Sequence, residues 1–451
     1  MVIPDAARRG HERWLLELTQ VPTAAGRERR VIDWISRWAS ERPDLTLDTD
    51  PAGNLVLAAA TERRAAPPRS PPIYFTAHLD HPAFVVERTL GPHAVTLSFR
   101  GGVLDDYFPG ARVTIHAHDG SRLPATIADS ADPGGDDTRG VFKHYLAELD
   151  GAPGTPAPDP RPGDIATWTL PPAQIRDGLL HAPACDDLAA VAAALAAFDL
   201  LRDPARLADH DAQDVRLLFT RAEEVGFLGA MAACRHATMP RDARVIALEN
   251  SRSFDDSPIG AGPIVRVGDR LSTFDPALTA ALAQRAEDLA SGRPNAQPAP
   301  TLPAPSRAEA PRPGNSPRPD PAARAPAAAP TAAAAGPNAS TPSPPPTPWK
   351  WQRKLMPGGA CEATVFCAAG YQATCLCLPL GNYHNMADLA AVQARTHTAP
   401  PAIAPEFISV ADFHALVDLL VACGQRLPAS PPVQARLDKL WHERAWVLAG
   451  K

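Results

Sequence analysis

Short apolar stretches with the length of buried strands alternate along this chain with longer stretches of helical pattern. The strand-like stretches include PIYFTAHLD, VRLLFT and RVIALEN, and the helical patterns include DDLAAVAAALAAFDLL, GFLGAMAACRH and DPALTAALAQRAEDLA. Unbroken apolar strands that alternate with helices are typical of a sheet that is covered on both faces. The sequence therefore predicts an α/β fold, with a mainly parallel mixed sheet flanked by helices.

Two stretches interrupt this alternation. Between residues 88 and 172, short strand patterns are separated by Gly, Pro and Asp, which predicts a small β-barrel or sandwich inserted into the α/β domain. Between residues 291 and 348, the chain holds 18 of its 52 prolines, 16 alanines and one large aliphatic residue, Leu302. Such a segment cannot bury enough apolar surface to offset its loss of conformational entropy, so we expect a disordered Pro/Ala-rich linker.

These boundaries divide the chain into five parts. Residues 1–87, 173–290 and 349–451 are expected to form one catalytic α/β domain. The third part belongs to it because the alternation resumes after the linker with CEATVFCAAG, YQATCLCLPL and ADFHALVDLLVAC. The β-rich insertion (88–172) and the linker (291–348) separate these parts.

Charge, hydropathy and cysteine content exclude several classes of partner. The chain has 44 Lys and Arg against 50 Asp and Glu, a formal net charge of −6, so no basic excess indicates nucleic acid or an anionic membrane. No apolar run approaches the length of a membrane span, and the N-terminal residues lack the apolar core of a signal peptide. The seven scattered cysteines are typical of reduced thiols. We expect a cytoplasmic protein without nucleic-acid or membrane partners.

Histidine and acidic residues stand at or just after the ends of the predicted strands, where open α/β sheets bind their ligands. These candidates are His78, Asp80, Asp186, Glu223, Glu224, Glu249 and His384. Imidazole and carboxylate groups in this mixture suit zinc, cobalt or manganese. The set offers more ligands than one tetrahedral ion needs. Two divalent ions that share one carboxylate would use a set of this size.

Spacing indicates roles for some of these residues. His78 and Asp80 lie two residues apart in a predicted strand and so share one face, which would let Asp80 accept the second ring N–H of His78 and fix its tautomer. Asp186 opens a predicted helix, where aspartate is also a common N-cap. We expect Asp187, in the first turn, to complement the helix dipole rather than to bind a metal directly.

The adjacent glutamates Glu223 and Glu224 follow the strand VRLLFT. A solvated strand end would explain them, but the apolar residues on both sides argue against it. Neighbouring side chains on a turning backbone point in different directions. One glutamate can therefore bind a metal while the other acts as a general base.

Several motifs, taken in order, resemble those of a known peptidase family. The stretches AHLDHPAFVV, ACDDLAAVAAAL, TRAEEVGFLGA, VIALENS and LPLGNYHNM are similar to those of the co-catalytic zinc peptidases. The similarity is strongest to metallopeptidase family 42, the glutamyl and deblocking aminopeptidases, some of which are labelled endoglucanase M. A β-rich insertion between the HxD strand and the following aspartate favours this family over the related families 20 and 28.

The resemblance implies two metal ions, zinc first and cobalt or manganese as alternatives. Its ligands would be His78 and Glu249 on one ion, His384 and Glu224 on the other, and Asp186 between them. Glu223 would be the general acid/base that deprotonates a metal-bridging water, and Asp80 would orient His78. The implied activity is that of an aminopeptidase on short peptides, and the family's dimers and dodecamers imply a homo-oligomer.

Two alternative hypotheses stay open. Family 42 usually has aspartate where Glu249 stands, and in family 20 a glutamate there accompanies carboxypeptidases and deacylases. The chain could therefore be an amidohydrolase of N-acyl amino acids or a carboxypeptidase. The other hypothesis is an inactive scaffold or binding protein, whose mark would be the loss of a ligand or of Glu223, and the sequence shows neither.

Overall fold

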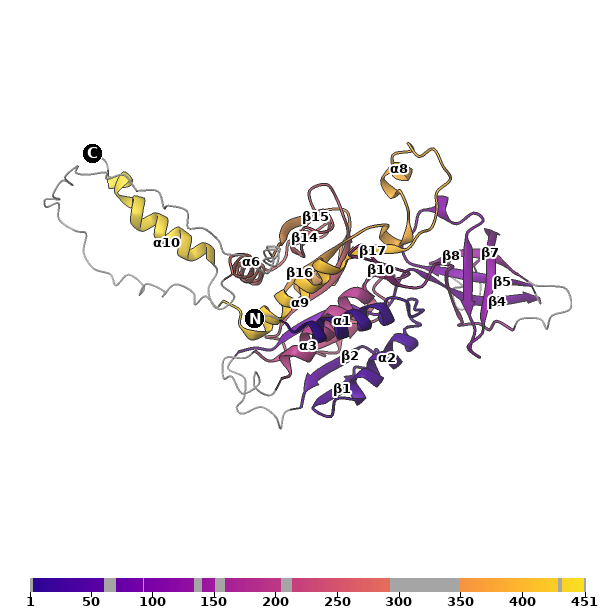
Figure 1. The fold of residues 1–451 in the computed structure, drawn as a ribbon, viewed down its shortest axis with the longest axis horizontal. Helices are drawn as coiled ribbons and strands as arrows, with labels where there is room; N and C mark the ends of the chain where they lie inside the picture. Colours follow the sequence, from indigo (N-terminus) through magenta and orange to yellow (C-terminus); the bar gives the residue numbers. More distant parts are fainter. Residues whose placement is uncertain are drawn as a thin grey trace, which may run out of the picture. The chain divides into compact units, whose positions relative to one another are not determined.

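A computed structural model describes residues 3–60, 70–91, 93–133, 140–150, 159–203, 213–292, 349–428 and 432–449 (Figure 1). All of these residues belong to one compact unit. The linker expected over residues 291–348 lies outside the described residues, apart from its first two positions. Within the described ranges, no helix is both long enough and apolar enough to cross a membrane.

An eight-stranded mixed sheet forms the centre of the α/β domain. In spatial order its strands are β1 (Leu45–Thr49), β2 (Leu55–Ala59), β12 (Val215–Thr220), β3 (Ile73–His78), β13 (Arg244–Arg252), β16 (Gln372–Leu380), β14 (Ile264–Asp269) and β15 (Gln352–Met356). The four middle strands β12, β3, β13 and β16 are parallel. β14 and β15 are parallel to each other, and the other neighbouring strands are antiparallel. The expected α/β class is confirmed, with the parallel pairing concentrated at the centre of the sheet.

Helices cover both faces of this sheet because successive side chains of the buried strands point to opposite sides. One core packs on α1 (Asp5–Leu18), α2 (Arg29–Ser40), α3 (Leu188–Leu201), α6 (Pro276–Ala290) and α9 (Val410–Gln425). The opposite core packs on α5 (Leu228–Arg235) and α7 (Glu362–Ala368). On β3, for example, Phe75 belongs to the first core and Tyr74 to the second.

The inserted β-rich segment is a closed six-stranded barrel, which decides between the two expected forms. Its strands, in order around the barrel, are β4 (Ala83–Gly91), β5 (Ala94–Arg100), β8 (Lys143–Leu149), β7 (Arg122–Ser130), β6 (Arg112–His116) and β9 (Ile165–Trp168). Phe84, Phe99 and Phe108 pack edge to face in its interior. Because β4 begins at Ala83, the expected boundary at residue 88 falls inside this strand.

A small antiparallel sheet joins two distant parts of the chain. It consists of β10 (Gln174–Arg176), β11 (Leu179–Ala182) and β17 (Glu406–Ser409). β11 leads to the Asp186 segment, and β17 lies beside the turn that holds His384. The remaining described elements are η2 (Asp105–Tyr107), η3 (Tyr383–Asn385), α8 (Leu389–Gln393), α10 (Pro432–Arg444) and η4 (Ala445–Ala449).

Candidate metal centre

The parallel pairing of β12, β3, β13 and β16 brings the carboxyl ends of these strands to one edge of the sheet. Six of the seven residues that the sequence singled out line one cavity of about 190 Å³ there: His78, Asp186, Glu223, Glu224, Glu249 and His384. His78 ends β3, and the two glutamates follow β12. Strand topology thus gathers residues from five separate segments.

Asp186 lies between the two imidazole rings. Its Oδ1 is 3.4 Å from Nε2 of His78, and its Oδ2 is 3.5 Å from Nε2 of His384. Glu224 Oε1 is 3.3 Å from the same His384 nitrogen, so these three residues form one group with metal-ligand spacing. Glu249 joins His78 and Asp186 in another such group. The two groups share Asp186.

Both histidines present the same ring nitrogen to this site. Nδ1 of His384 lies 2.7 Å from the carbonyl oxygen of Gly102, and Nδ1 of His78 lies 3.1 Å from the carbonyl oxygen of Asp80. A ring whose Nδ1–H donates to a carbonyl keeps Nε2 free to bind a metal. The loop after barrel strand β5, which carries Gly102, therefore helps to orient a residue of the α/β domain.

Two buried oxygens in the cluster point to a cation. Among the described residues, Asp186 Oδ1 and Glu249 Oε1 are buried and make no hydrogen bond. A buried carboxylate oxygen that accepts no hydrogen bond is costly, and a divalent ion with nitrogen and oxygen ligands would remove that cost. The donor set of two imidazole nitrogens and three carboxylates fits zinc, cobalt or manganese.

The electrostatics of the site agree with this interpretation. Burial raises the pKa of Glu223 well above its ordinary value, and the neighbouring Glu224 adds to the rise. Burial also raises the pKa of Glu249, with a further contribution from Glu223. Burial opposes the ionisation of Asp186 too, yet the imidazoles of His384 and His78 lower its pKa. So many buried carboxylates require positive charge nearby to remain ionised.

Asp80, the seventh predicted residue, lies under the turn that carries the paired glutamates. Its Oδ1 accepts the backbone N–H of Glu223 at 2.9 Å, and its Oδ2 accepts that of Glu224 at 3.0 Å. Oδ1 is also 3.5 Å from Nδ1 of His78. The HxD spacing indicated the approach to His78 but not the two contacts with the glutamate turn.

Asp187 is held by other contacts, although it lies within reach of His78, Asp186 and Glu249. Its carboxylate accepts the backbone N–H of His78 at 3.3 Å and the side-chain N–H of Asn250 at 2.8 Å. It also occupies the position that precedes the first residue of α3. These contacts suit the expected position at the helix terminus.

Glu406, on β17, is a residue of the site that the sequence did not reveal. Its fully buried carboxylate accepts the backbone N–H groups of Cys185, Asp186 and His384, at 2.7, 3.0 and 2.8 Å. Burial raises its pKa to about 7. Glu406 thereby ties two candidate ligands together. Its only sequence signal is an acidic residue at the start of an apolar stretch, which is not specific.

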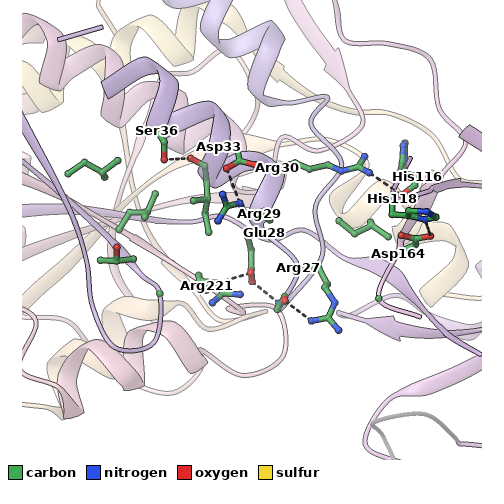
Figure 2. A pocket seen from close by; sticks show the side chains of 18 residues that line it. Arg27, Glu28, Arg29, Arg30, Asp33, Ser36, His116, His118, Asp164 and Arg221 are labelled. Atoms are coloured by element: carbon green, nitrogen blue, oxygen red, sulfur yellow. Dashed lines mark hydrogen bonds and ion pairs between the residues drawn. The ribbon is translucent and has the colours of Figure 1, made fainter. Parts of the chain in front are cut away.

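A larger cavity of about 780 Å³ lies between the start of α2 and the barrel strands β6 and β9 (Figure 2). Arg27, Arg29, Arg30 and Arg221 are among its lining residues. None of the groups with metal-ligand spacing found in the described part of the chain contributes to this lining. The candidate metal chemistry therefore belongs to the smaller cavity.

Comparison with known proteins identifies relatives of both the sequence and the fold. A sequence model of the M42 glutamyl aminopeptidase family matches residues 59–290. A search of curated proteins found no match.

Among solved structures, an aminopeptidase from the archaeon Desulfurococcus kamchatkensis shares 18% identity and a TM-score of 0.62, over 94% of this chain and 96% of that chain. A TET aminopeptidase from a marine sediment thaumarchaeon shares 16% identity and a TM-score of 0.63, over 93% and 97%. The TET1 peptidase of Pyrococcus horikoshii, which can assemble into a tetrahedron or a large octahedral shell, shares 18% identity and a TM-score of 0.60, over 92% and 99%. At these identities the structural similarity shows a common fold.

Proposed function

This chain belongs to the M42 glutamyl aminopeptidase family and is a metal-dependent peptidase, and from this premise we propose a dinuclear aminopeptidase that removes N-terminal residues from short peptides. The observation that carries the proposal is the position of Asp186, whose two carboxylate oxygens face Nε2 of His78 and Nε2 of His384. A carboxylate between two such nitrogens is suited to bridge two ions.

In this proposal His78, Glu249 and Asp186 would hold one ion, and His384, Glu224 and Asp186 would hold the other. Zinc is the first choice, and cobalt or manganese would accept the same ligands. When bound, the ions supply a Lewis acid that polarises the scissile carbonyl and activates water. Asp80 contacts both His78 and the backbone of the glutamate turn, and so it would fix their positions relative to each other.

Glu223 is the proposed general base. Its carboxylate lines the cavity, with Oε2 3.9 Å from Nε2 of His78, and the role leaves Glu224 free to act as a ligand. A carboxylate that lines the cavity without binding an ion is suited to take up a proton from the attacking water. The same carboxyl group can then return the proton to the departing amine.

Substitution of the two adjacent glutamates tests these roles separately. We expect Glu223→Gln to keep its bound metal and to lose about 10²- to 10⁴-fold in kcat, as loss of a general base does. The matched variant Glu224→Gln should lose bound metal as well as activity. Metal content and kcat, measured on both variants and the parent, distinguish the two outcomes. A Glu223→Gln variant with kcat within threefold of the parent would refute the assignment.

A second candidate function is favoured by Glu249, which stands where the family usually has aspartate. That candidate is hydrolysis of N-acyl amino acids or of peptide C-termini. Aminoacyl anilides with a free amine, assayed beside N-acyl amino acids, distinguish the two candidates, since turnover of only the blocked substrates would exclude the aminopeptidase. Purified protein that turns over neither class, even after addition of zinc, cobalt or manganese, would favour the scaffold hypothesis.

We further propose that the protein is a homo-oligomer in the cytoplasm. The assemblies of the Pyrococcus horikoshii TET1 peptidase, which has the same fold, support this proposal. Native mass spectrometry of the full chain measures the number of copies, and a monomer at micromolar concentration would contradict it.

A further inference from the structure

Side chains from three other segments hold the turn formed by residues 221–224, named here the acidic turn because it ends in the two glutamates. Asn54 Oδ1 accepts the N–H of residue 221 at 3.1 Å, and Glu28 Oε1 accepts that of residue 222 at 3.0 Å. Asp80 accepts the N–H groups of residues 223 and 224 at 2.9 and 3.0 Å. Each of these consecutive backbone amides is therefore bonded to a side-chain oxygen.

Asn54 and Glu28 both lie outside the candidate metal cluster, and of these two only Glu28 is a carboxylate. It immediately precedes α2, and its side chain is fully buried. Besides the acidic turn, its Oε1 accepts the N–H of Gly26 at 2.7 Å, and its Oε2 accepts Nε–H of Arg221 at 2.8 Å. Figure 2 shows Glu28 among the side chains that line the large cavity, with a dashed line to Arg221. A carboxylate with three donors on its two oxygens has little freedom to move.

The backbone of the acidic turn needs such support. The backbone of Ala222 has a φ of +53°, in the left-handed region that residues other than glycine rarely adopt. A residue in this conformation persists only where its surroundings hold it there. The N–H of Ala222 donates to the carboxylate of Glu28, so this hydrogen bond holds the backbone at the unfavourable position, one residue before Glu223.

We propose that Glu28 is a positioning residue for the acidic turn and that its carboxylate fixes where Glu223 stands relative to the metal ligands. The inference rests on the proposed function, in which Glu223 moves the proton. A displacement of about 1 Å in a reacting group can lower the rate about 100-fold. Loss of the Glu28 carboxylate therefore lowers kcat, while the metal ligands and the substrate cavity keep their residues.

A buried ion pair elsewhere in the fold provides the matched control. Asp44 is buried and pairs with Arg202 at 2.9 Å, and its arginine is about as exposed as Arg221. Arg202 follows the end of α3, whereas Arg221 belongs to the acidic turn. Removal of either carboxylate breaks an ion pair with a partly exposed arginine, and each arginine keeps another contact, Arg202 with Asp199 and Arg221 with the carbonyl of Ala52. Of the two carboxylates, Glu28 is the one that bonds to the acidic turn.

The test compares Glu28→Ala with Asp44→Ala in the full chain. For Glu28→Ala we expect kcat to fall about 30-fold or more, with KM and bound metal within about threefold of the parent. For Asp44→Ala we expect kcat within threefold of the parent. Hydrogen exchange, read by mass spectrometry on peptides that span residues 219–229, should be at least tenfold faster in Glu28→Ala only. Glu28→Asp, which keeps the charge and shortens the side chain, serves if Glu28→Ala does not fold.

The outcomes separate this inference from the proposed function. Equal kcat and equal exchange in the Glu28 and Asp44 variants would show that Glu28 only stabilises the fold and would overturn the inference. A rise in KM without loss of kcat would overturn it too. If the parent hydrolyses neither class of substrate, the proposed function fails, while hydrogen exchange still tests whether Glu28 holds the turn.

Discussion

At the scale of single residues, the cluster around Asp186 combines buried carboxylates with very few compensating charges. Asp186 Oδ1 and Glu249 Oε1 make no hydrogen bond with the described residues. Burial raises the pKa values of Glu223 and Glu249, which means that ionised carboxylates are unfavourable here without added positive charge. The folded site therefore gains stability when a divalent cation binds.

Removal of metal should lower the stability of the protein measurably. A ligand that binds only the folded state adds about 2.7 kcal/mol to the free energy of unfolding at a free concentration of 100 times its Kd. We expect chelator-treated protein to melt about 3 °C below protein with added zinc, since the entropy of unfolding of a chain of this size converts such a change in free energy into a shift of that order. Glu224→Gln should reduce this difference. Equal Tm values with and without metal in the parent would contradict a resident metal site.

His116 predicts a separate loss of stability in mild acid. Burial lowers its pKa to about 4 from the ordinary 6.5, and the nearby Arg30 and Arg122 contribute. The unfolded chain therefore takes up a proton between pH 6.5 and 4 that the folded chain does not. Stability from this residue is fully present above pH 6.5 and is lost as the pH falls towards 4.

We expect the free energy of unfolding to fall by about 1 to 2 kcal/mol between pH 7 and pH 5 on account of His116 alone. Urea unfolding at both pH values measures the fall. His116→Asn should reduce it. A pH dependence that is the same in His116→Asn and the parent would show that other groups cause it.

At the scale of elements, the sequence predicted the strands and helices whose pattern of apolar and polar residues is local. The apolar run VRLLFT is bounded by polar residues and forms β12 over the same residues. The positions of the candidate ligands at strand ends could be brought together from the sequence because parallel strands place their carboxyl ends at one edge. The start of the barrel was expected five residues too late. Pro82 marks a break after β3, but the apolar residues 83–86 that follow it do not show to which domain they belong.

The side chains that fix the site between elements could not be predicted. Glu28, Asn54 and Glu406 bond to backbone N–H groups that are distant in sequence. Before the fold is known, each looks like a polar residue beside a helix or strand, of the kind that usually meets solvent. Their partners follow from tertiary packing, which brings α2, β2 and β17 to the carboxyl edge of the central sheet.

At the scale of the whole molecule, the barrel and the α/β domain share the candidate metal centre. The barrel is inserted between β3 and the Asp186 segment, and its Gly102 carbonyl meets Nδ1 of His384. Arg30, on α2, donates to the carbonyl of His116 on the barrel. The orientation of the barrel is therefore linked to that of a candidate ligand, so activity is expected to depend on both parts.

The segment 293–348 should be dispensable for activity. It lies outside the described residues, and its composition predicts no contribution to a core. Its flanks are held independently, since α6 packs in the main core and β15 pairs with β14. We expect replacement of residues 293–348 by about 20 Gly and Ser residues to keep kcat/KM within threefold. Shortening the loop about threefold should change the free energy of unfolding by only about 1 kcal/mol.

Kinetics and thermal unfolding of this variant test the expectation, and the number of copies in solution is measured on the same sample. A variant that folds and assembles like the parent but loses activity would show that the segment contributes to substrate binding or catalysis. A variant that keeps activity but assembles differently would instead indicate that the segment limits contacts between copies. The first result would contradict the prediction, because a chain so poor in large apolar residues is expected to act as a spacer.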